Sequence, residues 1–206
     1  MAMPRAAVGR GLRVLRSTPW LPVCGTSGLA TALLVGAALA PHQPFVPFAA
    51  VIAVAACGGA AAYLLDEDTA PVLDATPTSR GVRTCWRLLP LAVPATASLA
   101  GLAALDRADS SGRWLQLVPV ALGSMAAGTG LAAALRRSSS TPGDLAAAVT
   151  LVGVLLVVAV DPLRRWAPAV PLGEGPGVGR SMLMWTAVVV VSGCAVALFS
   201  RDPVHH

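Results

Sequence analysis

The longest polar interval of the chain separates two apolar runs and reads LLDEDTAPVLDATPTSRGVRTCWRLLP across residues 64–90. It opens with four acidic residues, Asp66, Glu67, Asp68 and Asp74. It closes with three arginines, Arg80, Arg83 and Arg87. Because the apolar runs on both sides are long enough to cross a bilayer, the interval is expected to be a loop between two membrane spans.

A short helix is expected within this loop, over residues 69–75. Thr69 can serve as its N-cap, and Pro71 can occupy its first turn, where the missing N–H is not needed. Thr76 precedes Pro77 and therefore avoids the α region, which ends the helix. A short helix that lies between two spans and is flanked by opposite charges is typical of a docking element rather than of a catalytic site.

The bulk composition indicates an all-α, polytopic membrane protein. The chain has 206 residues, of which 55% are hydrophobic and only 12% are charged, whereas a soluble domain carries about 25% charged residues. All 15 basic residues are arginines, which with the abundant Ala, Gly and Val suggests a GC-rich genome such as that of an actinobacterium. The net charge of +5 is attributed to membrane topology and not to nucleic-acid binding.

Six membrane spans are expected within a single transmembrane domain over residues 1–206. They are placed near residues 21–40, 45–65, 88–105, 114–135, 144–161 and 181–200. Gly58 and Gly59 should allow close helix approach in the second span. Pro90 and Pro94 predict a kink or a late start in the third. Ser98, Ser124, Thr129 and Ser192 are interpreted as residues that pack helices together or line a transport pathway.

The orientation follows from the distribution of arginine. With the N-terminus inside, the inner segments hold 10 arginines and the outer segments hold 5. This positive-inside bias predicts that both termini and the loop over residues 64–90 are cytoplasmic, in a protein of the plasma membrane.

The N-terminal residues 1–20 contain four arginines and no acidic residue: Arg5, Arg10, Arg13 and Arg16. Their spacing, with apolar residues on another face, predicts a helix that lies on anionic membrane lipid. A disordered basic tail remains an alternative. A cleaved signal peptide is rejected, because a long apolar run and further spans follow.

The loop over residues 64–90 resembles the cytoplasmic loop after the second span of type-2 ABC exporter permeases. The resemblance rests on Glu67, Thr69, Leu73, Thr76, Pro77, Thr78, Ser79, Arg80 and Arg87. Elsewhere the similarity extends only to the layout of the spans. The Gly-Thr pair usual in the family is absent, and Pro71 interrupts a region that is normally more helical.

The resemblance implies a permease subunit with a docking helix for a separate ABC ATPase, which would bind ATP and Mg²⁺. The docking residues it implies are Glu67, Thr69, Leu73, Thr76, Pro77, Ser79 and Arg80. A second permease copy or a paralogue would complete the transporter. The chain itself has no lysine and therefore no Walker A motif. We accordingly expect no enzymatic activity, no catalytic residue and no cofactor on this chain.

The remaining polar residues indicate no other chemistry. The four cysteines have no metal-like spacing, and His42 is interpreted as a loop residue at headgroup level. No charged residue lies near the middle of an expected span, which argues against an ion-coupled transporter and favours an amphipathic or hydrophobic substrate.

Two alternatives stay open. The outer loop over residues 161–180 is either an interfacial loop anchored by Trp166 or a re-entrant element. The whole chain could also be a non-transporting accessory or immunity-type membrane subunit with a permease-like shape.

Overall fold

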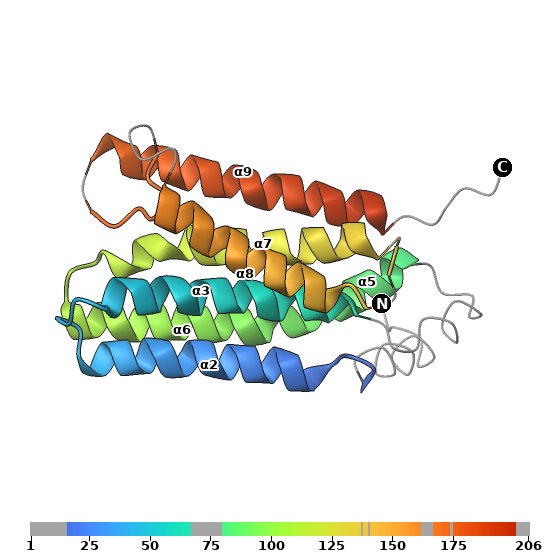
Figure 1. Ribbon diagram of the computed structural model, residues 1–206, viewed down its shortest axis with the longest axis horizontal. Helices are drawn as coiled ribbons and strands as arrows, with labels where there is room; N and C mark the ends of the chain where they lie inside the picture. The colour runs from blue at the N-terminus through green and yellow to red at the C-terminus, as the bar shows by residue number, and fades with distance from the viewer. Residues whose placement is uncertain are drawn as a thin grey trace, which may run out of the picture.

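The computed structural model describes residues 16–66, 80–136, 138–139, 141–161, 167–173 and 175–200. Every regular element in these residues is helical (Figure 1). The α-helices are α2 (Trp20–Leu39), α3 (Val46–Ala62), α5 (Arg80–Leu88), α6 (Ala92–Asp109), α7 (Val118–Leu135), α8 (Gly143–Val160) and α9 (Pro176–Phe199). Three 3₁₀ turns adjoin them: η1 (Tyr63–Leu65), η2 (Leu89–Leu91) and η3 (Trp114–Leu117).

In the part of the chain that the structure describes, six helical segments are long and apolar enough to span a membrane, and the chain is a multi-pass membrane protein. These segments are Trp20–Leu39, Val46–Leu65, Thr84–Asp109, Trp114–Leu135, Gly143–Val160 and Pro176–Phe199. The shortest has 18 residues, which at 1.5 Å per residue covers about 27 Å, close to the thickness of a bilayer's hydrocarbon core. The predicted number of spans is thus confirmed, and the first, second, fourth and fifth lie within one residue of their expected bounds.

The third span begins earlier than the sequence predicted. We expected it to start near residue 88, but α5 is already helical from Arg80 and the apolar segment begins at Thr84. Pro90 does not delay the helix; instead the 3₁₀ turn η2 surrounds it, because proline lacks the N–H of an α-helical hydrogen bond and its ring clashes with the preceding turn. Arg87 therefore belongs to a helix and not to the loop before it.

The last span also begins earlier than expected. Helix α9 starts at Pro176 rather than near residue 181, with proline in the first turn, where it is well tolerated. The described part of the preceding segment, residues 167–173, contains bends and no helix. Trp166, the expected membrane anchor, lies outside the described residues.

Helix α3 lies at the centre of the bundle and contacts α2, α6, α7 and α8. Most residues of the span Val46–Leu65 are buried. The predicted close approach at Gly58 is confirmed, because a Cβ there would lie only 2.8 Å from the backbone oxygen of Ser124 on α7. Ser124 also donates from Oγ to the Val54 carbonyl at 3.1 Å, as expected for a helix-packing serine.

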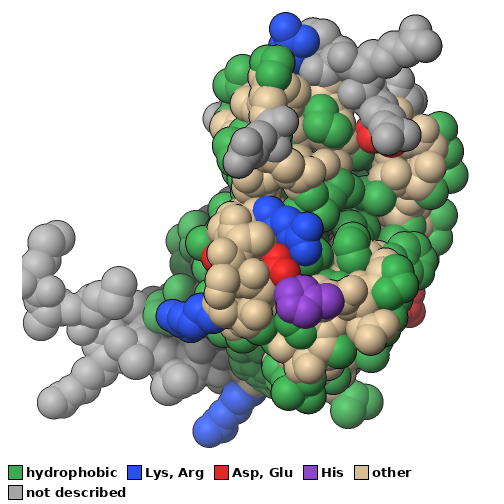
Figure 2. All heavy atoms as spheres, turned by 90° about the vertical axis from the view of Figure 1, so that its left-hand side faces the viewer, with side chains coloured by type: hydrophobic (Ala, Val, Ile, Leu, Met, Phe, Trp, Pro, Cys, Tyr) green, Lys and Arg blue, Asp and Glu red, His purple; other side chains and the backbone are tan. Residues whose placement is uncertain are grey.

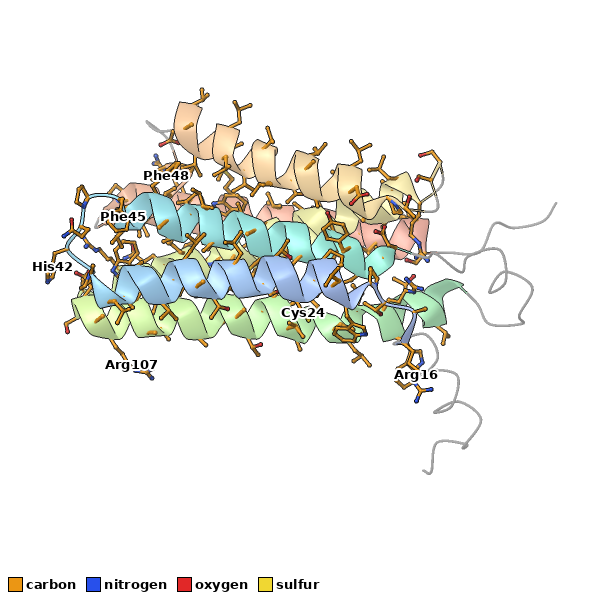
Figure 3. All side chains as sticks on the ribbon, turned by 60° about the horizontal axis from the view of Figure 1, so that its bottom comes forward. Arg16, Cys24, His42, Phe45, Phe48 and Arg107 are labelled. Atoms are coloured by element: carbon orange, nitrogen blue, oxygen red, sulfur yellow. The ribbon has the colours of Figure 1, made fainter. Side chains whose placement is uncertain are left out.

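The bundle has two polar ends. Helix α2 begins, α3 ends, α5 begins and α9 ends at one of them, which we call the Asp66 end (Figure 1). The other contains the α2–α3 and α6–α7 connections and is called the Asp109 end. Figure 3 shows Arg16 at the Asp66 end and His42 and Arg107 at the Asp109 end. Six spans thus bring the first and last described residues to the same end.

Candidate functional site

Most of the residues predicted to dock an ATPase lie outside the described residues. These are Glu67, Thr69, Leu73, Thr76, Pro77 and Ser79. Arg80 begins helix α5, but its side chain is not described. Of the basic residues predicted to contact membrane lipid, Arg5, Arg10 and Arg13 are also outside, while Arg16 is exposed. The docking helix and the interfacial helix therefore remain predictions.

The structure does describe both flanks of the docking segment, which we define as residues 67–79. Asp66 immediately precedes it and is only 7% exposed. Its carboxylate oxygen Oδ1 accepts a hydrogen bond from the backbone N–H of Gly143 at 2.5 Å. Gly143 is the first residue of α8. An anion at this position satisfies a free N–H group and interacts favourably with the helix dipole, so Asp66 ties the end of η1 to the start of α8.

Arg87 is buried completely on the other flank of the docking segment. Its Nη1 group donates to the backbone carbonyl of Asp66, which is 21 residues away in the chain. Its Nη2 group donates to Oγ of Ser17 at 3.0 Å, across 70 residues. Because a buried guanidinium needs hydrogen-bond acceptors to offset its lost hydration, these contacts fix the relative positions of α5, η1 and the segment before α2.

A second arginine extends this cluster to helix α7. Arg136 is the C-cap residue of α7, and its Nη1 group donates to Oγ1 of Thr84 at 3.3 Å. Thr84 lies on α5 and is 2% exposed. We define the Arg87 cluster as Ser17, Asp66, Thr84, Arg87, Arg136 and Gly143. It joins the flanks of the docking segment to the ends of five helices: α2, α3, α5, α7 and α8.

The geometry of the cluster leaves no space for a side chain at Gly143. A Cβ at this position would lie 2.7 Å from Cγ of Asp66 and closer still to Oδ2. The contact requires glycine because Asp66 approaches the α8 backbone directly. The chain reaches α8 through Pro142, which is also buried.

The sequence interpretation missed this cluster. Asp66 was assigned to a run of loop acids, and Arg87 was assigned to the same loop and counted among its cytoplasmic arginines. The available signal was local: each charged residue directly adjoins apolar residues, Leu64 and Leu65 in one case and Leu88 and Leu89 in the other. Their opposite charges at the ends of consecutive spans could have suggested that they are neighbours.

The Asp109 end contains a different polar cluster, whose contacts indicate a structural role. Asp109 Oδ2 accepts a hydrogen bond from Trp114 Nε1 at 2.9 Å and pairs with Arg113 Nε at 3.0 Å. The Arg113 guanidinium lies 4.8 Å from the centre of the Trp114 ring. His42 Nδ1 is 3.6 Å from Asp109 Oδ1, with its side chain largely exposed, which agrees with its expected place in a loop. Figure 2 looks onto this end and shows acidic, basic and histidine side chains side by side.

The Arg87 cluster is thus the candidate site, because it is the buried polar cluster that adjoins the docking segment. Its contacts hold helix ends together. What it offers is a rigid connection between a loop and the helices of the membrane domain. Comparisons of the chain with protein-family models, with curated proteins and with solved structures gave no match.

Proposed function

We propose that this chain is the membrane subunit of an ATP-driven exporter, similar to type-2 ABC permeases. A separate ATPase subunit would bind the docking segment and supply energy from ATP and Mg²⁺. A second copy of the chain, or a paralogue, would complete the transport unit. The observation that carries this proposal is the attachment of both flanks of the docking segment to the Arg87 cluster.

The mechanical argument starts from the positions of Asp66 and Arg87. If the docking segment joined the spans through loose linkers, a push from an ATPase would bend the linkers and leave the helices in place. Here the residue before the segment is hydrogen-bonded to α8, and the helix after it is bonded back to Asp66 and to Ser17. A displacement of the docking segment would therefore move α3, α5 and α8 together.

The orientation supports the same proposal. The segments expected at the Asp66 end contain 10 of the 15 arginines. The positive-inside rule favours a cytoplasmic location for this end in the plasma membrane, where an ATPase could reach the docking segment. The substrate would be amphipathic or hydrophobic, since the middle of the spans offers no fixed charge to an ion.

The test is a substitution at Leu73, the expected apolar anchor of the docking helix. Burying one leucine in a groove of the ATPase would contribute roughly 1.5–3 kcal/mol. Leu73→Asp should remove this contribution and place a charge in the groove, so the amount of ATPase that co-purifies in mild detergent should fall by at least about tenfold. Membrane insertion should be nearly normal, because the docking segment lies outside the spans.

The matched control is Ser110→Asp, which adds the same charge to an exposed residue at the opposite end of the bundle. It should leave both co-purification and ATP hydrolysis unchanged. Intact ATPase binding and intact coupled hydrolysis in Leu73→Asp would contradict the proposal. The non-transporting accessory or immunity-type subunit would then be the better interpretation.

A further inference from the structure

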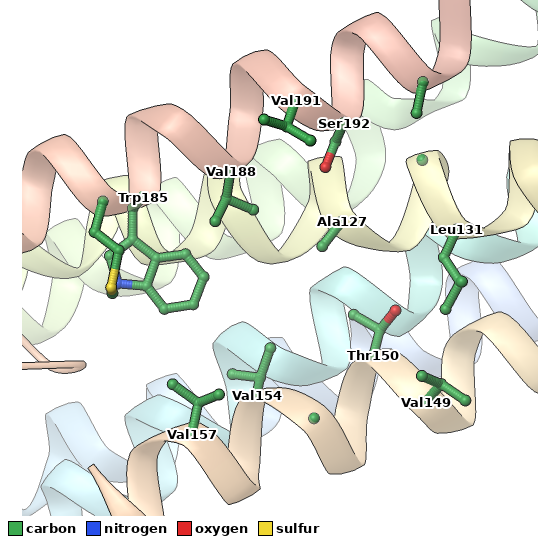
Figure 4. A pocket seen from close by; sticks show the side chains of 14 residues that line it. Ala127, Leu131, Val149, Thr150, Val154, Val157, Trp185, Val188, Val191 and Ser192 are labelled. Atoms are coloured by element: carbon green, nitrogen blue, oxygen red, sulfur yellow. The ribbon is translucent and has the colours of Figure 1, made fainter. Parts of the chain in front are cut away.

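A cleft of about 580 Å³ lies between α8 and α9, with α7 as its floor. Figure 4 shows Val154 and Val157 on α8 facing Trp185 and Val188 on α9, with Ala127 and Leu131 of α7 behind them. The volume is within the usual range of ligand sites, about 300–1,000 Å³.

The cleft results from the positions of the small residues that let each helix pack closely on its neighbour. Helix α9 packs closely on α7, where a Cβ at Gly130 would lie 3.0 Å from Cβ of Ser192. Helix α8 packs mainly on α3, where a Cβ at Gly59 would lie 3.7 Å from Cβ of Ala147, and less extensively on α7. Because α8 lies mostly against α3 and α9 lies against α7, a gap remains between α8 and α9. Gly153 lines this gap on α8, and a Cβ there would have nothing within 4 Å.

The cleft is at the depth of the bilayer's hydrocarbon core. Gly153 lies near the middle of the span Gly143–Val160, and Val188 lies near the middle of the span Pro176–Phe199. Several residues that line the cleft are themselves exposed and apolar, including Val149 and Val157 on α8 and Val191 on α9. The medium at the opening is therefore lipid hydrocarbon.

The lining favours an apolar occupant that is narrower than a helix. Its hydroxyl groups are those of Thr150 and Ser192, and the rest of the lining is almost wholly apolar. Three turns of a helix about 10 Å wide would occupy roughly 1,300 Å³, which is far more than the cleft holds. An empty cleft would forfeit dispersion contacts along all three helices. An extended hydrocarbon chain is slender enough to fit and makes these contacts.

We propose that this cleft binds the acyl chain of a membrane phospholipid, which enters from the bilayer between α8 and α9. The bound chain fills the space that packing on α7 and α3 leaves open, and so supports α9 on the side where none of the described helices covers it. This binding site does not depend on the proposed transport function, because it follows from the shape and depth of the cleft alone.

The experiment uses the full-length protein in phospholipid vesicles that contain a phosphatidylcholine with a photoactivatable diazirine in the middle of one acyl chain. After irradiation, mass spectrometry of peptides locates the adducts. A chain inside the cleft should label Val154, which is 7% exposed, and Val188 as strongly as it labels Val152 and Leu156, which are 61% and 60% exposed. Adducts confined to the exposed positions would overturn the proposal, because they report only lipid around the protein.

Two matched variants test whether the cleft itself is responsible. Gly153→Phe places a ring in the cleft without a clash at Cβ, and labelling of Val188 should fall by roughly tenfold, equal to about 1.4 kcal/mol of binding free energy. Gly193→Phe adds the same ring to α9 at a glycine that also has nothing within 4 Å of a Cβ but does not line the cleft. It should leave the labelling unchanged. Labelling of Val188 that persists in Gly153→Phe would overturn the proposal. If this variant cannot be purified, the relative labelling of buried and exposed positions in the wild-type protein decides whether the proposal stands.

Discussion

Arg87 has an unusual environment for a charged residue next to a membrane span. Such residues commonly extend toward the headgroups and remain hydrated, but Arg87 is buried and donates hydrogen bonds to the Asp66 carbonyl and to Ser17. Hydrogen bonds of a charged group contribute about 1.5–3 kcal/mol each, partly offset by the cost of burying the charge. The residue therefore stabilises the junction of three chain segments rather than the contact with lipid.

Replacement of Arg87 by methionine should lower the free energy of unfolding by about 2 kcal/mol, because the apolar side chain fills similar space but makes neither hydrogen bond. The free energy of unfolding of Arg87→Lys should lie between those of the wild type and Arg87→Met, since a single ammonium group cannot reproduce the fork of a guanidinium. Denaturant unfolding in detergent micelles measures the change. Arg107→Met, at an exposed arginine of the opposite end, is the control and should alter stability by less than about 0.5 kcal/mol. Equal losses at the two positions would show that the buried contacts contribute nothing specific.

Helix α8 contains two glycines with opposite packing requirements. Gly143 begins the helix against the Asp66 carboxylate, and a Cβ there would be 2.7 Å from Cγ of Asp66. Gly153, ten positions later by number, faces the cleft with open space around it. The first glycine is needed for contact between two elements, while the second costs helix stability and leaves the cleft wide.

The same substitution at these two positions should therefore have opposite effects. Gly143→Ala forces Asp66 away from the α8 N-terminus and should destabilise the protein by about 1–3 kcal/mol, as overpacking does. Gly153→Ala should stabilise it by roughly 0.5–1 kcal/mol, because alanine favours the helix over the unfolded chain. Thermal unfolding of the two variants in the same detergent measures both changes. A destabilised Gly153→Ala would mean that the cleft is closed in solution.

The molecule as a whole is polar at two ends and apolar along its sides. Exposed leucine, valine and phenylalanine side chains occur on all the spanning helices, as the hydrocarbon surroundings of a membrane protein require. The two ends differ in construction: the Asp66 end joins helices from distant parts of the chain, whereas the Asp109 cluster is mostly local, around the α6–α7 turn. This difference agrees with a docking role at the Asp66 end.

Cysteine labelling with a membrane-impermeant maleimide should confirm the orientation in intact cells. In a background that lacks the four native cysteines, Ser110→Cys at the Asp109 end should react from outside, and Ser139→Cys at the Asp66 end should react only after permeabilisation. Both serines are exposed, so accessibility within the protein does not bias the comparison. External labelling at residue 139 would reverse the topology and remove the argument for a cytoplasmic ATPase.

The amino-acid sequence alone predicted the membrane class, the number of spans and most of their bounds, because run length and hydropathy are local properties that the bilayer itself demands. It also predicted the close contact at Gly58, since small residues in a membrane span allow a neighbouring helix backbone to approach. The third and sixth spans began earlier than expected, because a proline and flanking arginines were interpreted as loop signals.

The burial of Asp66 and Arg87 could not be predicted in the same way. It depends on which helices become neighbours, and that choice brings Ser17, Asp66, Arg87 and Gly143 together from four separate segments. The cleft between α8 and α9 has the same origin, since α8 packs mainly on α3 whereas α9 packs on α7. Pairings across the bundle are set by the fit of all the helices at once, so only the tertiary structure decides them.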